Sequence, residues 1–144
     1  MIGELVNMLL DQHSEMGQFK ASIPRLTLKV ERMVADGSVI VARGDDGRII
    51  ATMGLETYRP YWTEQEVIGD AWIYIRHGHR SLRVFRALIA EAVRYAKTAN
   101  LPLLISLFSL KDYDRKARLF EKHARRILTV YGLTEMGGEF RVAV

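Results

Sequence analysis

The stretch IRHGHRSLRVFRALI, residues 75–89, carries four arginines and two histidines where an expected β-strand leads into an expected helix. Backbone N–H groups at a helix N-terminus bind phosphate readily, and the helix dipole strengthens that attraction. Loops that do so usually carry several glycines, because the backbone must come close to the ligand. Here Gly78 is the single glycine. The sequence therefore leaves two interpretations open, an anion-binding loop that relies on arginine charge or a basic surface turn.

Several other kinds of chemistry are excluded or disfavoured by the sequence. It has no cysteine, which excludes disulfides, thiolate metal sites and a cysteine nucleophile. His77 and His79 are close together, but His13 and His123 fall in distant expected helices, and a zinc site needs three or four ligands. We therefore expect no metal. Neither a G-x-S-x-G elbow nor a P-loop occurs, so a serine hydrolase or nucleoside triphosphatase is not indicated.

Length and composition indicate one globular domain over residues 1–144, with 49% hydrophobic and 26% charged residues. The N-terminus has Glu4 and Asp11 inside its apolar part and no basic segment. We therefore expect no signal peptide or membrane span, and a cytoplasmic location. Residues 76–126 hold 13 Lys/Arg against four Asp/Glu, whereas the rest hold eight against 13. Such a basic half suits an anionic ligand, although two helices with solvated basic faces give the same pattern.

Hydrophobic spacing and turn residues predict helices over 2–16 and 22–35, a hairpin over 39–56, a strand over 67–75, a helix over 81–100, a strand over 101–108, a helix over 113–130 and a strand over 139–144. This order, α-α-β-β-β-α-β-α-β, predicts an α/β fold with a mixed sheet and helices on both faces. Regular alternation in strand 67–75 places Ala71 with Ile73 and Ile75 on one face, opposite Trp72 and Tyr74. The loop after this strand lies where such sheets open a ligand crevice.

The element order and several motifs resemble the GNAT family of acetyl-CoA-dependent N-acetyltransferases over nearly the whole chain. In that family a strand leads through V-x-P-x-x-R into an R-x-x-G-x-G/A pyrophosphate loop and a helix that begins with Ala-Leu. Here Ile75 takes the valine position, Arg80 is the signature arginine, and Ala87-Leu88 match the start of the helix. The segment LFEK (119–122) resembles the family's L-Y-E-K, and Tyr131-Gly132-Leu133 resembles its G-F corner.

Four positions depart from the family pattern. His77 replaces the proline, Arg83 and Phe85 replace the two small residues of the loop, and Phe120 stands where many members carry a tyrosine proposed as general acid. Divergent members associated with bacteriophage genomes tolerate a loop of this kind. A side chain at position 83 or 85 would be expected to hinder close approach of the backbone to a pyrophosphate.

The resemblance implies a cofactor site for acetyl-CoA. Its pyrophosphate would be bound by the side chain of Arg80 and by the loop and helix start at Ser81, Leu82, Arg83, Val84 and Phe85. Its pantetheine arm and thioester would lie along the backbone of Ile73, Tyr74 and Ile75.

The implied reaction is transfer of the acetyl group to a primary amine by direct attack, since no cysteine can carry an acyl group. The candidates for general base are Glu66 and Asp70, with Glu56 as a third. Tyr113 is the candidate general acid, and Tyr131 is an alternative to it. The aromatic loop 57–66, with Tyr58, Tyr61 and Trp62, fits an acceptor pocket, a lid over the core or a dimer contact.

A different class of function fits the same basic half. A catalytically degenerate domain of this fold would bind nucleic acid or a protein through it, and the lost glycines and missing tyrosine suit such a domain. Aromatic residues do not alternate with the basic ones as in a stacking platform, so nucleic acid is not the favoured partner. The acceptor and the oligomeric state stay open, although members of this fold are often homodimers.

Overall fold

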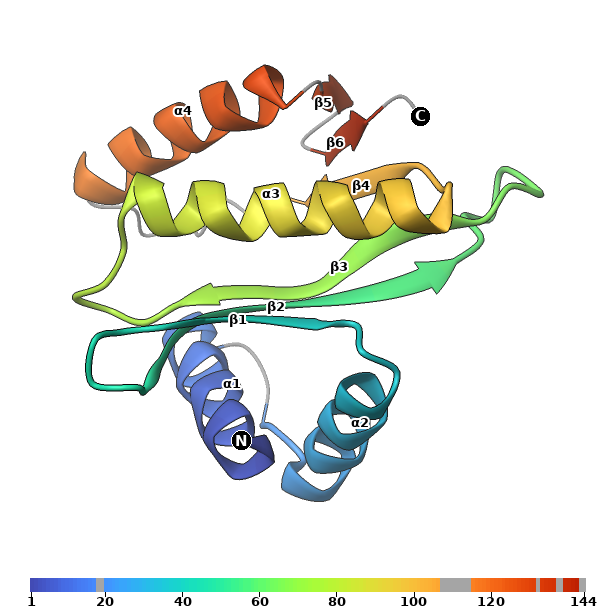
Figure 1. Cartoon of the computed structure of the whole chain (residues 1–144). Coiled ribbons are helices and arrows are strands. Elements are labelled where there is room, and N and C mark those ends of the chain that lie inside the picture. Colours follow the sequence, from blue (N-terminus) through green and yellow to red (C-terminus); the bar gives the residue numbers. More distant parts are fainter. Residues whose placement is uncertain (18–19, 107–114, 132, 137–138, 143–144) are drawn as a thin grey trace.

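The computed structural model describes residues 1–17, 20–106, 115–131, 133–136 and 139–142. The described elements, in chain order, are α1 (Ile2–Met16), α2 (Ile23–Ala35), β1 (Val39–Arg43), β2 (Ile49–Tyr58), β3 (Val67–Ile75), α3 (Leu82–Ala99), β4 (Leu103–Ser106), α4 (Arg115–Val130), β5 (Leu133–Met136) and β6 (Glu139–Val142). Figure 1 shows their arrangement along the chain. Among the described residues, no helix is both long enough and apolar enough to cross a membrane.

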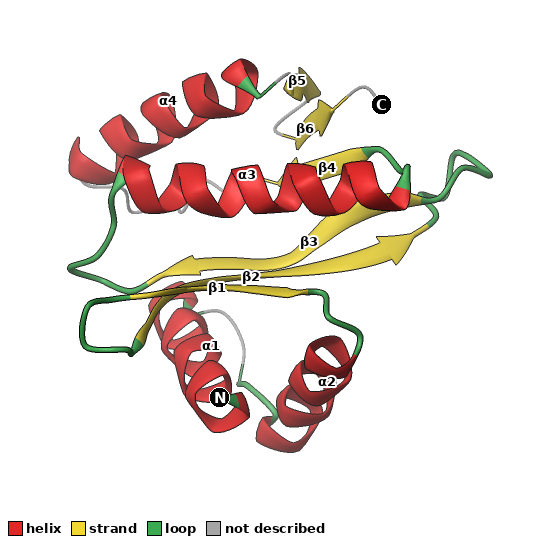
Figure 2. Cartoon of the chain, viewed as in Figure 1, coloured by secondary structure: helices red, strands yellow, loops and turns green. Residues whose placement is uncertain are grey.

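The strands form one mixed sheet in the order β1-β2-β3-β4-β6-β5. Neighbouring strands are antiparallel except β3 and β4, which are parallel and joined by the crossover through α3. Figure 2 shows α1 and α2 on one side of the sheet and α3 and α4 on the other. The predicted α/β class, with a mixed sheet and helices on both faces, is confirmed.

Each face of the sheet has its own hydrophobic core. The core under α3 and α4 combines the buried faces of these helices with side chains of β2, β3 and β4. The other core joins α1 and α2 to the opposite face, through residues that include Ile49, Trp72 and Tyr74. Helix α1 thereby lies against the C-terminal half of β3, which brings distant polar residues together at that end of the strand.

Helix α3 forms because its apolar residues recur at helical spacing and both of its ends are capped. Its buried side chains are Phe85, Leu88, Ile89, Ala92, Val93 and Ala96. At the N-terminus the hydroxyl of Ser81 accepts a hydrogen bond from the amide of Val84. At the C-terminus Asn100 adopts the left-handed conformation that commonly ends helices, with φ of 53°. The caps fix the helix start immediately after the basic loop.

Strand β3 contains a β-bulge at Ala71. The register between β2 and β3 shifts after Gly54, which leaves Ala71 as the extra residue of β3. Ala71 therefore packs on the same face as Trp72, against α1 and α2, whereas Ile73 and Ile75 contact the core under α3. The predicted grouping of Ala71 with Ile73 and Ile75 was wrong, because strict alternation makes no allowance for an inserted residue.

The part of the chain that the structure describes has one strand more than predicted. β5, with the sequence LTEM, pairs antiparallel with β6, in the pair Met136 to Glu139 among others. The prediction missed β5 because four residues without clear alternation are too short to give a strand signal. The expected final strand is present as β6, which pairs with β4 as well as β5.

Candidate functional site

Among the described residues, strands β3 and β4 pair at two positions and then separate. Ile68 pairs with Leu103 and Gly69 with Leu104, whereas β3 continues as a strand to Ile75. Figure 1 shows the two strands diverging towards the end of β3 that leads into α3. The C-terminal half of β3 therefore has a strand edge that β4 does not pair with. We call the point of separation the fork.

Asp70 bridges the two strands at the fork. Its Oδ1 accepts a hydrogen bond of 2.7 Å from the backbone N–H of Ser106, the last residue of β4. Of the three candidate bases, Asp70 is the one on the diverging part of β3. Glu66 is exposed and precedes β3, about 13 Å along the chain from Asp70. Glu56 forms an ion pair with Lys29, and the two side chains are 42% and 46% exposed.

The unpaired edge of β3 directs its backbone groups towards the diverging strand. The amide of Arg76 donates to the carbonyl of Ile50 in β2, at 2.9 Å. Because backbone groups alternate along a strand, those of Ile73 and Ile75 point the opposite way. The carbonyl of Ile73 accepts from Nε2 of Gln12 and that of Ile75 from Nε of Arg80, each at 3.1 Å. Side-chain donors thus bind both carbonyls. The amides of Ile73 and Ile75 point in the same direction as these carbonyls, towards the diverging strand.

A tight turn carries the chain from β3 to α3. Gly78 adopts φ of 87°, a left-handed conformation that costs a residue with a side chain energy, and the amide of His79 donates to the carbonyl of Arg76 at 3.0 Å. The one glycine of this loop is therefore required by the turn. The chain then enters α3 at Ser81, the N-cap residue, so the positive end of the helix dipole faces the turn.

The residues expected to bind pyrophosphate have different surroundings. Phe85 is 2% exposed and belongs to the core under α3, and its amide donates to the carbonyl of Ser81. Leu82 and Val84 are half-buried against the same core. Arg83 is exposed to solvent. The side chain of Phe85 therefore does not obstruct the outside of the helix start, whereas that of Arg83 lies there.

Helix α1 supplies carboxylates to this end of β3. Glu15 accepts a hydrogen bond of 2.8 Å from the hydroxyl of Tyr74 and also pairs with the guanidinium of Arg80. Asp11 lies 3.4 Å from the guanidinium of Arg76, whose Nε donates to a backbone carbonyl of β2. Two of the four arginines in the basic stretch are therefore neutralised by carboxylates 65 residues earlier in the chain.

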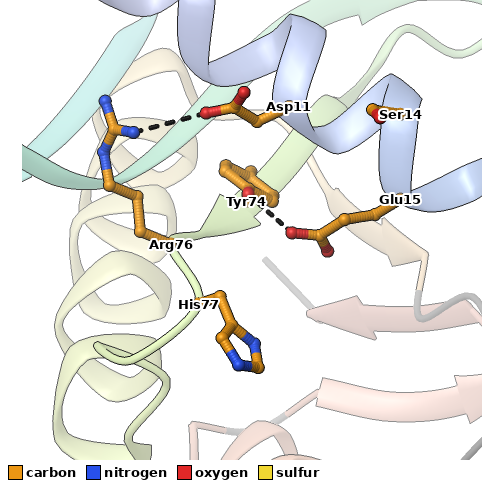
Figure 3. A pocket seen from close by; sticks show the side chains of 6 residues that line it. All are labelled: Asp11, Ser14, Glu15, Tyr74, Arg76 and His77. Atoms are coloured by element: carbon orange, nitrogen blue, oxygen red, sulfur yellow. Dashed lines mark hydrogen bonds and ion pairs between the residues drawn. The ribbon is translucent and has the colours of Figure 1, made fainter.

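Four of these side chains, all but that of Arg80, line a pocket of about 350 Å³ between α1 and the end of β3. Figure 3 shows Asp11, Ser14 and Glu15 of α1 facing Tyr74, Arg76 and His77. Burial, followed by the hydrogen bond and the charge of Glu15, raises the pKa of Tyr74 to about 12, and the charge of Arg80 opposes the rise. The Tyr74 hydroxyl is thus a hydrogen-bond donor at every physiological pH.

The aromatic and tyrosine candidates lie apart from one another. Tyr61 and Trp62 project from the loop between β2 and β3, 98% and 61% exposed, with their rings edge-to-face. The ring of Tyr58 instead lies across Gly69 at the fork, where a Cβ on Gly69 would come within 2.6 Å of it. Tyr131 packs against the core under α3. The candidate acid Tyr113 lies outside the described residues.

Sequence reasoning missed the contribution of α1. Gln12 bonds to Ile73 of β3, 61 residues later in the chain, and Glu15 bonds to Tyr74, 59 residues later. Glu15 also pairs with Arg80 in the loop that follows β3. In the sequence both occur as ordinary polar positions of an amphipathic helix, so no local signal marks them. Among the described residues, no three His, Asp or Glu side chains come together in a way that would hold a metal ion.

The fold is of the acetyltransferase type. Its defining features are the forked mixed sheet, the β-bulge beside the fork and the capped start of α3. A family profile described as the acetyltransferase (GNAT) family matches residues 4–124. The chain belongs to this family and is an acetyltransferase. A comparison with curated proteins gives no match.

Solved structures with the same fold include several acetyltransferases. A putative acetyltransferase from an Arthrobacter species has 22% identity and a TM-score of 0.64, covering 95% of this chain and 83% of that one. A predicted acetyltransferase from Clostridium acetobutylicum, solved with acetyl-CoA, has 19% identity and a TM-score of 0.63, covering 94% and 85%. A ribosomal-protein-alanine N-acetyltransferase from Brucella melitensis has 17% identity and a TM-score of 0.54, covering 85% and 83%.

Proposed function

We propose that the protein uses acetyl-CoA to acetylate a primary amine. The observation that carries this proposal is the fork: in the part of the chain that the structure describes, β3 leaves β4 after two residue pairs, and its C-terminal half leads to the N-terminus of α3. A structure of the same fold from Clostridium acetobutylicum contains acetyl-CoA. An extended thioester arm ending in a pyrophosphate fits a strand edge followed by a positive helix end.

The residues of the chain suit the two ends of that ligand in different ways. The outward amides of Ile73 and Ile75 would donate to carbonyl groups of the pantetheine arm. The amides of Leu82 and Arg83, in the first turn of α3, would donate to the pyrophosphate, since the amide of Val84 is already bonded to Ser81. The guanidiniums of Arg80 and Arg83 would add charge-assisted bonds.

We propose direct attack of the amine on the thioester. The amine nitrogen forms a bond to the acetyl carbon, the carbon–sulfur bond breaks, the nitrogen loses a proton to a base, and the thiolate leaves and takes up a proton. Asp70 is the proposed base, because it lies on β3 at the fork and Glu66 does not. Tyr113 remains the proposed acid. The chain has no cysteine that would carry an acyl intermediate.

Binding of nucleic acid through the basic half is the weaker alternative. Arg76 and Arg80 are already paired with Asp11 and Glu15, which removes two charges from the surface that would contact phosphates. A gel shift at low salt tests this alternative directly. Retention of non-specific DNA, lost as salt increases, would support it.

Calorimetric titration with acetyl-CoA tests the cofactor site. We expect saturable binding that Arg80→Ala weakens about tenfold or more, because it loses a charge-assisted contact. Arg94→Ala is the matched control, since Arg94 is an exposed arginine of α3 paired with Glu91, distant in sequence from the loop. Absence of binding by the folded native protein would refute the proposal.

An amine screen then tests the reaction. Release of the coenzyme A thiol can be followed with a disulfide reagent, and the protein itself contributes no thiol background because it has no cysteine. Small amines, peptides with free N-termini and lysine-containing peptides form the acceptor panel. Cofactor binding without amine-dependent thiol release in the whole panel would argue against acetyl transfer to these amines.

A further inference from the structure

Helix α2 brings a lysine ammonium group to the part of the sheet that forms the fork. Nζ of Lys29 donates to Oε2 of Glu56 at 2.5 Å. Glu56 lies on β2 directly opposite Gly69, which is the last residue of β3 that pairs with β4 in the described part of the chain. The carboxylate that binds Lys29 therefore belongs to the residue across from the fork, with the two strand backbones about 4.8 Å apart.

The pair of Lys29 and Glu56 lies on the face of the sheet that α1 and α2 cover. Residues that pair across two strands share a face, as do residues two apart on one strand, which groups Glu56 with Gly69 and Tyr58. The ring of Tyr58 lies across Gly69, in agreement with this grouping. On this face the backbone at the fork is therefore bordered by the ring of Tyr58 and by the ion pair, with no side chain on Gly69 itself.

The acetyl group of bound acetyl-CoA would lie at the same point. With the pyrophosphate at the start of α3 and the arm along Ile75 and Ile73, the thioester extends along β3 towards Gly69. The ammonium group of Lys29 stands on a flexible four-carbon stem, and an ion pair between partly exposed side chains holds it weakly. Nζ can therefore turn from the carboxylate to a thioester at the fork, where attack requires a separation of about 3–3.5 Å.

The other lysines with described side chains are placed differently. Lys97 and Lys122 belong to α3 and α4, on the opposite side of the sheet (Figure 2), and both are exposed. Lys20 is exposed and precedes α2. Among the described residues, Lys29 is thus the lysine that a carboxylate binds beside the fork.

We propose that the protein acetylates its own Lys29. This inference rests on the proposed function, because acetyl-CoA supplies the acetyl group. The Glu56 carboxylate, which already accepts a hydrogen bond from Nζ, takes one proton from the ammonium group. The neutral nitrogen then forms a bond to the acetyl carbon, and the carbon–sulfur bond breaks. The departing thiolate takes the second proton of the nitrogen, and Glu56 returns the first to water.

Mass spectrometry after incubation with acetyl-CoA tests the proposal. The native protein should gain the mass of one acetyl group, whereas Lys29→Arg keeps the positive charge and should not gain it on the same timescale. Cleavage after Arg25 and Arg32 gives the peptide 26–32, in which Lys29 is the only lysine, so the modified site is read directly. Lys97 is the internal control and should be modified at least about tenfold more slowly, because it gains nothing from proximity to the thioester.

The kinetics of the modification test its mechanism. At saturating acetyl-CoA the rate constant should not change when the protein is diluted, because Lys29 and the fork belong to the same copy. Glu56→Gln should lower this rate constant on the order of 100-fold, since an amide cannot take up the proton. Glu91→Gln makes the same change in the exposed ion pair of α3 and should leave the rate constant unchanged.

Calorimetric binding of acetyl-CoA by the same samples separates this proposal from the proposed function. If the protein binds acetyl-CoA but modifies Lys29 no faster than Lys97, the proposal is overturned and the proposed function stands. A rate constant that falls on dilution, or one that Glu56→Gln leaves unchanged in a folded variant, would also overturn it. Failure of the folded native protein to bind acetyl-CoA would overturn both.

Discussion

Replacing Glu15 by glutamine should strengthen the binding of acetyl-CoA. Glu15 pairs with Arg80, and their side chains are 36% and 42% exposed, so the pair contributes about 0.2–1 kcal/mol. To bind a phosphate, Arg80 must exchange the Glu15 carboxylate for the phosphate oxygens. Removing the carboxylate charge removes that cost, which corresponds to a dissociation constant about 1.4- to 5-fold lower. Glutamine keeps a carbonyl oxygen that accepts the hydrogen bond of Tyr74.

The assay is calorimetric titration with acetyl-CoA at low and high salt, with thermal unfolding as a check on the fold. Glu91→Gln is the matched control, since it makes the same charge change by removing the ion pair of Glu91 with Arg94. The gain from Glu15→Gln should shrink as salt screens the exposed charges. Equal effects of the two variants would assign the gain to net charge alone. Weaker binding by Glu15→Gln would refute the competition between carboxylate and phosphate for Arg80.

Three further predictions concern the fork, the α1 contact and the turn. Asp70→Asn keeps an oxygen for the amide of Ser106 but cannot take up a proton, so kcat should fall on the order of 100-fold with little change in the KM for acetyl-CoA. An unchanged kcat would mean that Asp70 is not the base and only bridges β3 and β4. Because the pKa of Tyr74 is raised from 10.0 to about 12, its contribution to stability is complete below pH 10 and lost as the pH rises towards 12. In Tyr74→Phe, the free energy of unfolding should not show this loss as the pH rises from 10 towards 12. Gly78→Ala should destabilise the fold by roughly 1–2 kcal/mol in urea unfolding, because φ at Gly78 is 87°. Gly3→Ala, at a helical position with open space around a Cβ, should be neutral or stabilising.

Local patterns were sufficient to predict most of the elements. Strand β3 was predicted with both of its ends correct, because alternating large apolar residues lie between a polar loop and a basic turn. The end of α3 followed from Asn100, which adopts the left-handed conformation. The bulge at Ala71 and the short β5 were missed, since both depend on pairing with another strand rather than on the segment's own pattern.

The site was less predictable than the fold for the same reason. The sequence places Arg80 and Asp70 near a ligand crevice, because both lie on or just after one strand. It gives no sign that Glu15 would neutralise Arg80 or that Gln12 would bond to the carbonyl of Ile73, since these contacts exist only once α1 packs on the sheet. Long-range polar contacts leave no periodic pattern in a sequence, whereas the apolar faces that pack the helix on the sheet do.

The two substitutions in the family's pyrophosphate signature have different physical consequences. Phe85 lies on the buried face of α3, in helical spacing with Leu88 and Ile89, so its ring fills the core and leaves the outside of the helix start unobstructed. Arg83 is exposed beside the amides that would bind the pyrophosphate. A long, flexible arginine can swing aside while its charge still attracts a phosphate, which a rigid apolar side chain at that position could not do. The loss of glycines is therefore compatible with an anion site in which arginine charge compensates for a less close contact between the backbone and the phosphate.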